Sequence, residues 1–199
     1  MPEPRPTVEE YKMGLAVEIA SRSNCVKTHV GSIILLDDRI RCVGYNGTIE
    51  GYTDCFEGGC ERCNDLSISR AEHLDRCVCV HAEENALVSA ARYGIEVQSA
   101  ECYVTHEPCL SCTKLLIQAH ISKVVYLKTY EYPGSTGQSK SREAMRLHSA
   151  KALANNEPGT LFVQFDQTLP AVVGWIQRLD EMKERALDYA RDKGVLKQI

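Results

Sequence analysis

Two short motifs, far apart in the sequence, place the tightest constraint on how this chain can fold. They are His81-x-Glu83 and Cys109-x-x-Cys112, and together they supply one imidazole, two thiols and one carboxylate. Three protein ligands with a fourth position open form the type of metal site that activates water, whereas structural zinc sites are closed by four ligands. A chain that uses both motifs at one metal ion must bring them to the same point of its core.

The spacing within each motif indicates how the ligands are presented. His81 and Glu83 stand at the start of one predicted helix, and Cys109 and Cys112 at the start of another. Two residues three positions apart share a helix face, and the positive end of a helix favours thiolate over thiol. We therefore expect His81, Cys109 and Cys112 to bind zinc, and Glu83 to carry a proton for the bound water. The alternatives are a purely structural zinc, or a core histidine beside buried thiols.

Composition indicates one domain in a reducing compartment. The chain has 199 residues, of which 44% are hydrophobic. It has no run of roughly 18 apolar residues, so no membrane span is expected. Residues 1–6 are proline-rich and lack the apolar core of a secretion signal, which favours a cytoplasmic location. In that compartment the ten cysteines are expected to be metal ligands or buried thiols rather than disulfides.

The distribution of charge favours a small anionic substrate over nucleic acid. The formal net charge is −4, and the lysines and arginines are scattered along the chain rather than gathered into a stripe. Proteins that grip a long nucleic acid usually carry a basic face, whereas a small anion needs few cations.

Hydrophobic periodicity predicts strands that alternate with helices, which implies a sheet covered on both faces. Strands are expected at residues 30–36, 40–45, 101–105, 123–127 and 161–165, and helices at 7–20, 82–93, 109–119, 141–155 and 170–193. Loops are expected at 51–80, with one short helix at 67–74, and at 130–139. We divide the chain into a disordered tail at 1–6, a domain at 7–166 with a cysteine-rich loop insertion at 51–80, and a C-terminal helical extension at 167–199.

Further elements carry a resemblance to a known family. His-x-Glu followed by Pro-Cys-x-x-Cys is the signature of zinc-dependent nucleobase deaminases. Over about three quarters of the chain, residues 8–150, the sequence resembles the cytidine and deoxycytidylate deaminase superfamily, especially deoxycytidylate (dCMP) deaminases and their bacterial late-competence branch. Two departures are residues 48–50, where many members have a proline, and the continuation beyond residue 155. The matching segments are Val30-Gly31-Ser32, Gly44-Tyr45-Asn46-Gly47 with Gly51, 79–87, 103–112 and Lys123-Val124-Val125-Tyr126.

The resemblance implies a fold and an activity. The fold is a three-layer α/β/α sandwich of the cytidine-deaminase type with a central five-stranded mixed sheet. The activity is zinc-dependent hydrolytic deamination of dCMP to dUMP and ammonia, which feeds thymidylate synthesis, with zinc-bound hydroxide as nucleophile and Glu83 as proton shuttle. The resemblance further implies a homo-oligomer, often a hexamer, that dCTP activates and dTTP inhibits, with Mg²⁺ accompanying the regulatory nucleotide.

Three other functions stay open at this point. Zinc ligands do not choose the base, so the chain could deaminate cytidine, dCTP or a guanine-type ring. A nucleic-acid editing deaminase is disfavoured because the sequence lacks a basic stripe and aromatic-rich stacking segments. A non-catalytic zinc scaffold is disfavoured by the intact Glu83, which a scaffold does not need.

Candidate substrate-binding residues follow from the resemblance and from charge. The residue matching Asn46 contacts the substrate sugar in the family, and the alternative is an Asn-Gly turn chosen for its backbone. Arg22, Lys27 and Arg142 are candidates for binding a 5′-phosphate, or else solvated surface cations. Tyr132 matches a family loop tyrosine near the base, or else packs on the core.

The cysteine-rich insertion predicts a second, structural zinc. Cys60-x-x-Cys63 has zinc-knuckle spacing, and we expect this pair to bind the ion together with two further ligands. The alternative is a set of free thiols, packed as small hydrophobes. The candidates for the two further ligands are Cys55, His73, Cys77 and Cys79, whereas Cys25, Cys42 and Cys102 are expected only to pack in the core.

Overall fold

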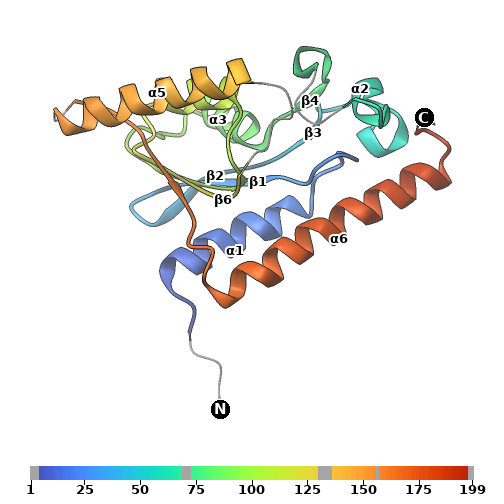
Figure 1. Cartoon of the computed structure of the whole chain (residues 1–199), viewed down its shortest axis with the longest axis horizontal. Helices are drawn as coiled ribbons and strands as arrows, with labels where there is room; N and C mark the ends of the chain where they lie inside the picture. Colours follow the sequence, from blue (N-terminus) through green and yellow to red (C-terminus); the bar gives the residue numbers. More distant parts are fainter. Residues whose placement is uncertain (1–4, 69–72, 130–135, 156, 197–199) are drawn as a thin grey trace.

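The chain folds around a five-stranded mixed sheet, as the computed structural model shows (Figure 1). The structure describes residues 5–68, 73–129, 136–155 and 157–196. The strand order is β2-β1-β5-β6-β7. The second strand in this order, β1 (Gly31–Leu36), runs antiparallel to the edge strand β2 (Arg39–Tyr45) and to the central β5 (Glu101–His106). The strands β6 (Lys123–Lys128) and β7 (Leu161–Gln164) continue the sheet in parallel to β5. This arrangement confirms the predicted mixed sheet.

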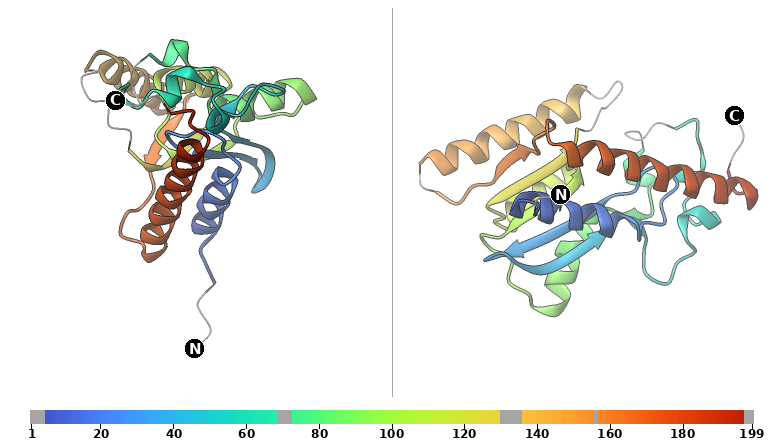
Figure 2. Two further views of the ribbon diagram at one scale, coloured as in Figure 1. Left: turned by 90° about the vertical axis from the view of Figure 1, so that its right-hand side faces the viewer. Right: turned by 90° about the horizontal axis from the view of Figure 1, so that it is seen from below.

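Helices cover both faces of the sheet, which makes three layers. On one face lie α1 (Val8–Ala20) and α6 (Pro170–Asp192), side by side in Figure 2. On the other face lie α3 (Ala82–Tyr93), α4 (Leu110–Gln118) and α5 (Thr136–Ala154). Each face has its own apolar core, one built around Met13, Tyr103 and Leu179, the other around Ala86, Val104 and Leu116. The predicted α/β/α sandwich is therefore confirmed.

The helix α6 begins as its sequence requires and packs along its apolar stripe. Pro170 occupies the first turn, where its missing N–H costs no hydrogen bond. Val172, Leu179 and Met182 are almost fully buried in the core shared with α1, whereas Val173 is 70% exposed. The helix therefore completes one layer of the sandwich. The division of the chain at residue 166 stays a prediction.

The cysteine-rich insertion contains more short elements than predicted. It holds η1 (Cys55–Glu57), α2 (Glu61–Asn64), η2 (Leu74–Arg76) and β4 (Cys79–Val80), and β4 pairs with β3 (Gly47–Thr48). The predicted short helix at 67–74 is wrong in its described part, because residues 67, 68 and 73 are not helical. Helix propensity is a weak guide for such short elements, which are held by tertiary contacts.

The helix α5 begins at Thr136, inside the loop predicted at 130–139, because packing against α4 and β7 favours the helix despite its early glycine and serine residues.

Within the described parts of the chain, no helix combines the length and apolar character needed to cross a membrane.

Candidate active site

The metal motifs lie at the N-termini of two neighbouring helices. His81 is the N-cap residue of α3 and directly follows β4, whereas Cys109 is the N-cap residue of α4. The backbone N–H of Cys112 donates a hydrogen bond to the Cys109 sulfur at 3.5 Å, which caps α4. Because α3 and α4 pack on the same core through residues such as Ala86 and Leu116, their first turns meet.

The three expected ligands are close enough to share one ion. The Nδ1 atom of His81 lies 3.3 Å from the Cys109 sulfur and 3.5 Å from the Cys112 sulfur. Tetrahedral zinc with ordinary bond lengths needs nitrogen–sulfur separations of about 3.6 Å. Contact with the Cys112 thiol lowers the pKa of Cys109 to about 4, with His81 adding to the effect and burial opposing it. One imidazole and two thiols therefore fit zinc both in geometry and in chemistry.

Glu83 is buried beside these ligands on the first turn of α3. Its side chain is almost inaccessible, with 4% of the residue exposed. Burial raises the pKa of Glu83 to about 7, although the neighbouring His81 acts in the opposite direction. A carboxyl group with a pKa near neutrality can both accept and donate a proton, which suits general acid–base work.

A cavity opens onto this group of residues. His81, Glu83 and Cys109 contribute to its lining, together with Asn46 and Lys27. A concave site with a few placed polar groups is the usual form of a small-molecule site.

Asn46 and Lys27 both have structural partners. The Asn46 side-chain oxygen accepts hydrogen bonds from Val30 N–H at 2.8 Å and from the Ser23 hydroxyl at 2.7 Å, and its amide donates to the Thr28 carbonyl at 2.8 Å. Asn46 thereby holds the segment that leads into β1 against the cavity. The Lys27 ammonium is buried and donates to the carbonyl of Asp65 at 2.8 Å and to that of Ile68.

A buried ion-pair network that the sequence did not reveal lies at the edge of the cavity. Glu107 lines the cavity, and its carboxylate lies 2.7 Å from the Arg146 guanidinium and 3.4 Å from that of Arg142. Arg146 also stacks over the ring of Phe162 at 4.6 Å. Glu107 precedes the cysteine motif and could have been singled out from that position. Of its partners on α5, Arg142 was expected only as a phosphate ligand, and Arg146 carries no local signal.

The remaining substrate-binding candidates lie in different environments. Arg142 is buried against Glu107, whereas Arg22 is exposed just after α1 and lies outside the described lining of the cavity. Tyr132 lies outside the described residues. Arg62, which the sequence analysis did not single out, is buried and lines the cavity.

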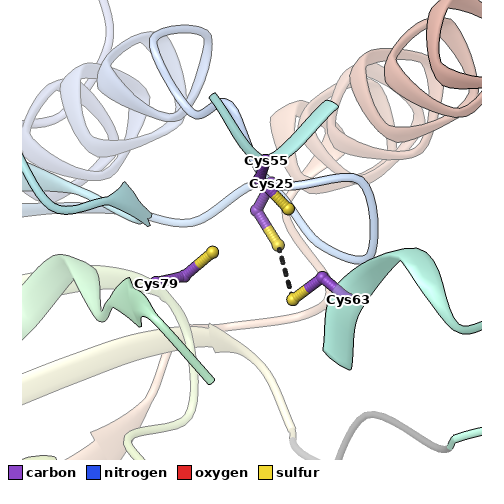
Figure 3. A group of neighbouring side chains, drawn as sticks. All are labelled: Cys25, Cys55, Cys63 and Cys79. Atoms are coloured by element: carbon purple, nitrogen blue, oxygen red, sulfur yellow. Dashed lines mark hydrogen bonds between the residues drawn. The ribbon is translucent and has the colours of Figure 1, made fainter. Parts of the chain in front are cut away.

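Six cysteines form a cluster beside the same cavity, and four of them line it. They make two groups of four, and within each group all sulfur atoms lie within 4.8 Å of one another. Figure 3 shows the first group, whose side chains converge from the loop after α1, from η1, from α2 and from β4. Cys25, expected only to pack in the core, belongs to it, whereas His73 is exposed and in neither group of described residues. The two groups are Cys25, Cys55, Cys63 and Cys79, and Cys60, Cys63, Cys77 and Cys79.

Comparison with known proteins gives consistent matches. The family model of the cytidine and deoxycytidylate deaminase zinc-binding region matches residues 6–128. The deoxycytidylate deaminase of Saccharomyces cerevisiae is 46% identical over 126 residues, which are 63% of this chain and 39% of that protein. The ComE operon protein 2 of Bacillus subtilis is 38% identical over 122 residues, 61% of this chain and 60% of that protein. The chain thus spans about two fifths of the length of its yeast relatives.

A solved structure agrees with these relatives. The dCMP deaminase of the cyanophage S-TIM5, in complex with dCMP and dUMP, superposes with a TM-score of 0.57 at 26% identity. The match covers 82% of this chain and all of the cyanophage chain. The resemblance drawn from the motifs is confirmed, and zinc is the metal that the family and the histidine and cysteine donors indicate. This chain belongs to the cytidine and deoxycytidylate deaminase family.

Proposed function

We propose that this chain catalyses the hydrolytic deamination of dCMP to dUMP and ammonia. The observation that carries the proposal is the buried Glu83 beside His81, Cys109 and Cys112 at the edge of a cavity. Support for dCMP as the substrate comes from the yeast relative named deoxycytidylate deaminase and from the cyanophage enzyme in complex with dCMP and dUMP.

The site residues have separate roles in this proposal. His81, Cys109 and Cys112 would hold a zinc ion, which when bound lowers the pKa of water. Glu83 takes a proton from the attacking water, delivers it to the ring nitrogen beside the amine-bearing carbon, and then helps the amine leave as ammonia. The burial that raises the pKa of Glu83 to about 7 supports both transfers, because neither protonation state is strongly favoured near neutral pH.

Substrate recognition would use groups around the cavity. Asn46 would contact the sugar while its other hydrogen bonds hold the lining segment in place. Lys27 and Arg142 would attract the 5′-phosphate, one from the cavity wall and the other through the network around Glu107. Tyr132 would lie near the base, and Arg22 would contribute only from the exposed surface.

Further properties belong to the same proposal. A second zinc would bind in the cysteine-rich insertion, where the two groups of thiols support it. The chain would assemble as a homo-oligomer such as a hexamer, activated by dCTP and inhibited by dTTP together with Mg²⁺. A cytoplasmic location would keep the thiol ligands reduced. Light scattering with and without each nucleotide tests the assembly and its regulation.

Ammonia release from parallel incubations tests the activity. The substrates are dCMP, dCTP, cytidine, deoxycytidine and guanine, and the key variants are Glu83→Gln and the matched control Glu84→Gln on the same helix turn. Glu83→Gln should keep its zinc and lose about 10²–10⁴-fold in turnover, whereas the control should stay within a few-fold of the wild type.

The outcomes separate the alternatives. Turnover of dCMP that depends on Glu83 supports the proposal. Turnover of another base alone moves the assignment to that base. Zinc retention without turnover of any substrate overturns the enzymatic proposal in favour of a zinc scaffold.

A further inference from the structure

The thiols beside the cavity are too many for one metal ion. The six-cysteine cluster consists of Cys25, Cys55, Cys60, Cys63, Cys77 and Cys79, and its two groups of four share Cys63 and Cys79. One tetrahedral ion takes four of these ligands and leaves two thiols buried against it. Two tetrahedra that share an edge need six ligands, which is the number that the two overlapping groups contain.

Separations between sulfur atoms agree with metal coordination. A zinc–sulfur bond of about 2.3 Å gives a tetrahedral edge of about 3.8 Å between sulfur atoms. In the first group, Cys25 lies 3.9 Å from Cys63, a contact drawn in Figure 3. In the second group, Cys77 lies 3.8 Å from Cys60 and 3.6 Å from Cys63. Edges of the expected length therefore occur in both groups, and Cys63 takes part in both.

We propose that the six-cysteine cluster binds two zinc ions bridged by the sulfur atoms of Cys63 and Cys79. Cys25 and Cys55 complete the first ion, and Cys60 and Cys77 complete the second. This inference deepens the single structural zinc of the proposed function and does not depend on the deamination.

The charges around the cluster support this assignment. Six thiolates around two divalent ions leave two negative charges, and two buried cations, Lys27 and Arg62, line the same cavity wall. The Arg62 guanidinium donates to the Cys63 sulfur at 3.8 Å. An isolated buried charge is costly. The negative cluster and the two buried cations therefore stabilise each other.

The position of the cluster gives it a structural task at the active site. It joins the loop after α1, η1, α2 and β4, and Leu187 and Ala190 of α6 pack against it. Cys79 stands two residues before His81, on the strand that leads into α3. The cluster therefore fixes one wall of the cavity and the strand β4, which leads into α3.

Counting zinc in the purified full-length protein is the first test. The prediction is three zinc ions per chain, one for each group of potential ligands. Cys109→Ser should remove one ion and leave the cluster filled. If the proposed catalytic zinc is wrong but the cluster is right, the wild type binds two ions and Cys109→Ser changes nothing.

Paired variants separate one ion from two in the cluster. Cys25→Ser/Cys55→Ser should lose one zinc, and Cys60→Ser/Cys77→Ser should also lose one, because each pair completes a different ion. A single ion held by one of the two groups needs only one of these pairs, so retention of all zinc by either double variant overturns the proposal. The control is Cys102→Ala, which removes a buried thiol outside the cluster and should leave the zinc count unchanged.

Cadmium NMR on the wild-type chain tests the bridge without any variant. After replacement of zinc by ¹¹³Cd, the cluster should give two resonances typical of four-thiolate coordination. Shared sulfur ligands should couple these two resonances to each other. A single four-thiolate resonance, or two resonances without coupling, would contradict the bridged pair.

Discussion

Gly44 on β2 lies directly against the backbone oxygen of Ala82 on α3, so that a Cβ at residue 44 would sit only 2.1 Å from that oxygen. Side chains are never found so close to backbone atoms, and the contact therefore requires glycine. Because Ala82 lies between His81 and Glu83, this close approach sets the position of the residues that carry the proposed chemistry.

Gly44→Ala should consequently push the start of α3 away from the sheet. We expect the free energy of unfolding to fall by about 1–3 kcal/mol, with a loss of turnover and of zinc. The matched control is Gly174→Ala in the exposed part of α6, where nothing lies near the new Cβ and the helix should gain roughly 0.5–1 kcal/mol. Urea unfolding of both variants checks the prediction, and equal stabilities would refute it.

Glu107 should be more important for stability than an exposed carboxylate. Glu107→Gln leaves the buried guanidinium of Arg146 without its ionic partner 2.7 Å away, which should lower the free energy of unfolding by about 3–5 kcal/mol. The control Glu50→Gln breaks the exposed pair with Arg92, 3.2 Å apart, and should change stability by about 0–1 kcal/mol. Thermal unfolding distinguishes the two, and a loss below 1 kcal/mol for Glu107→Gln would mean that the network adds little.

Lys12 should make stability fall at alkaline pH. Burial lowers the pKa of Lys12, but its contacts with Asp38 at 2.6 Å and Glu101 at 2.9 Å outweigh burial and raise the pKa well above the usual value. The contribution is complete below the unfolded-state pKa of about 10.4 and is lost as the pH rises towards the folded-state value. Lys12→Met should thus cost about 2 kcal/mol at pH 7 and progressively less above pH 10.4. A difference that stays constant up to pH 11 in urea unfolding would contradict this account.

The helix α6 should be indispensable to the fold. Leu179→Ala removes a side chain that is 2% exposed and should lower the free energy of unfolding by about 2–5 kcal/mol. Val173→Ala, at a position 70% exposed on the same helix, is the control and should change it by less than about 0.5 kcal/mol. Truncation after Asp166 should prevent stable folding, because it uncovers the core shared with α1. A truncated chain that unfolds at the wild-type temperature would show that the core does not need α6.

Metal removal should act on the cysteine-rich insertion as well as on turnover. Binding free energy of a structural metal is also folding free energy, so a chelator should abolish activity and expose the segment around α2 to proteolysis. Arg76, which is exposed between Cys63 and Cys77, offers trypsin a cleavage site. Zinc added before the protease should restore protection, and cleavage that is equally slow with and without metal would count against a structural role for the ion.

Local sequence predicted most of the secondary structure correctly and placed the His81 and Cys109 motifs at the starts of helices. The helices α3 and α4, whose N-cap residues are His81 and Cys109, lie within about one residue of their expected bounds, and the five strands lie within about two residues of theirs. The errors fall in 51–80 and 130–139, where elements are short or are extended by packing. Hydrophobic periodicity becomes visible only over several turns of helix. A four-residue helix such as α2 is too short to show it.

Helix spacing is a local property, so the sequence alone was enough to place His81, Glu83, Cys109 and Cys112 at the starts of helices. The contact of Cys25 with Cys63, 38 residues away, and that of Glu107 with Arg146, 39 residues away, are set by the fold as a whole. Such contacts depend on where the chain returns after crossing the sheet. The path of the chain is set by the packing of whole layers, which no short pattern of residues encodes.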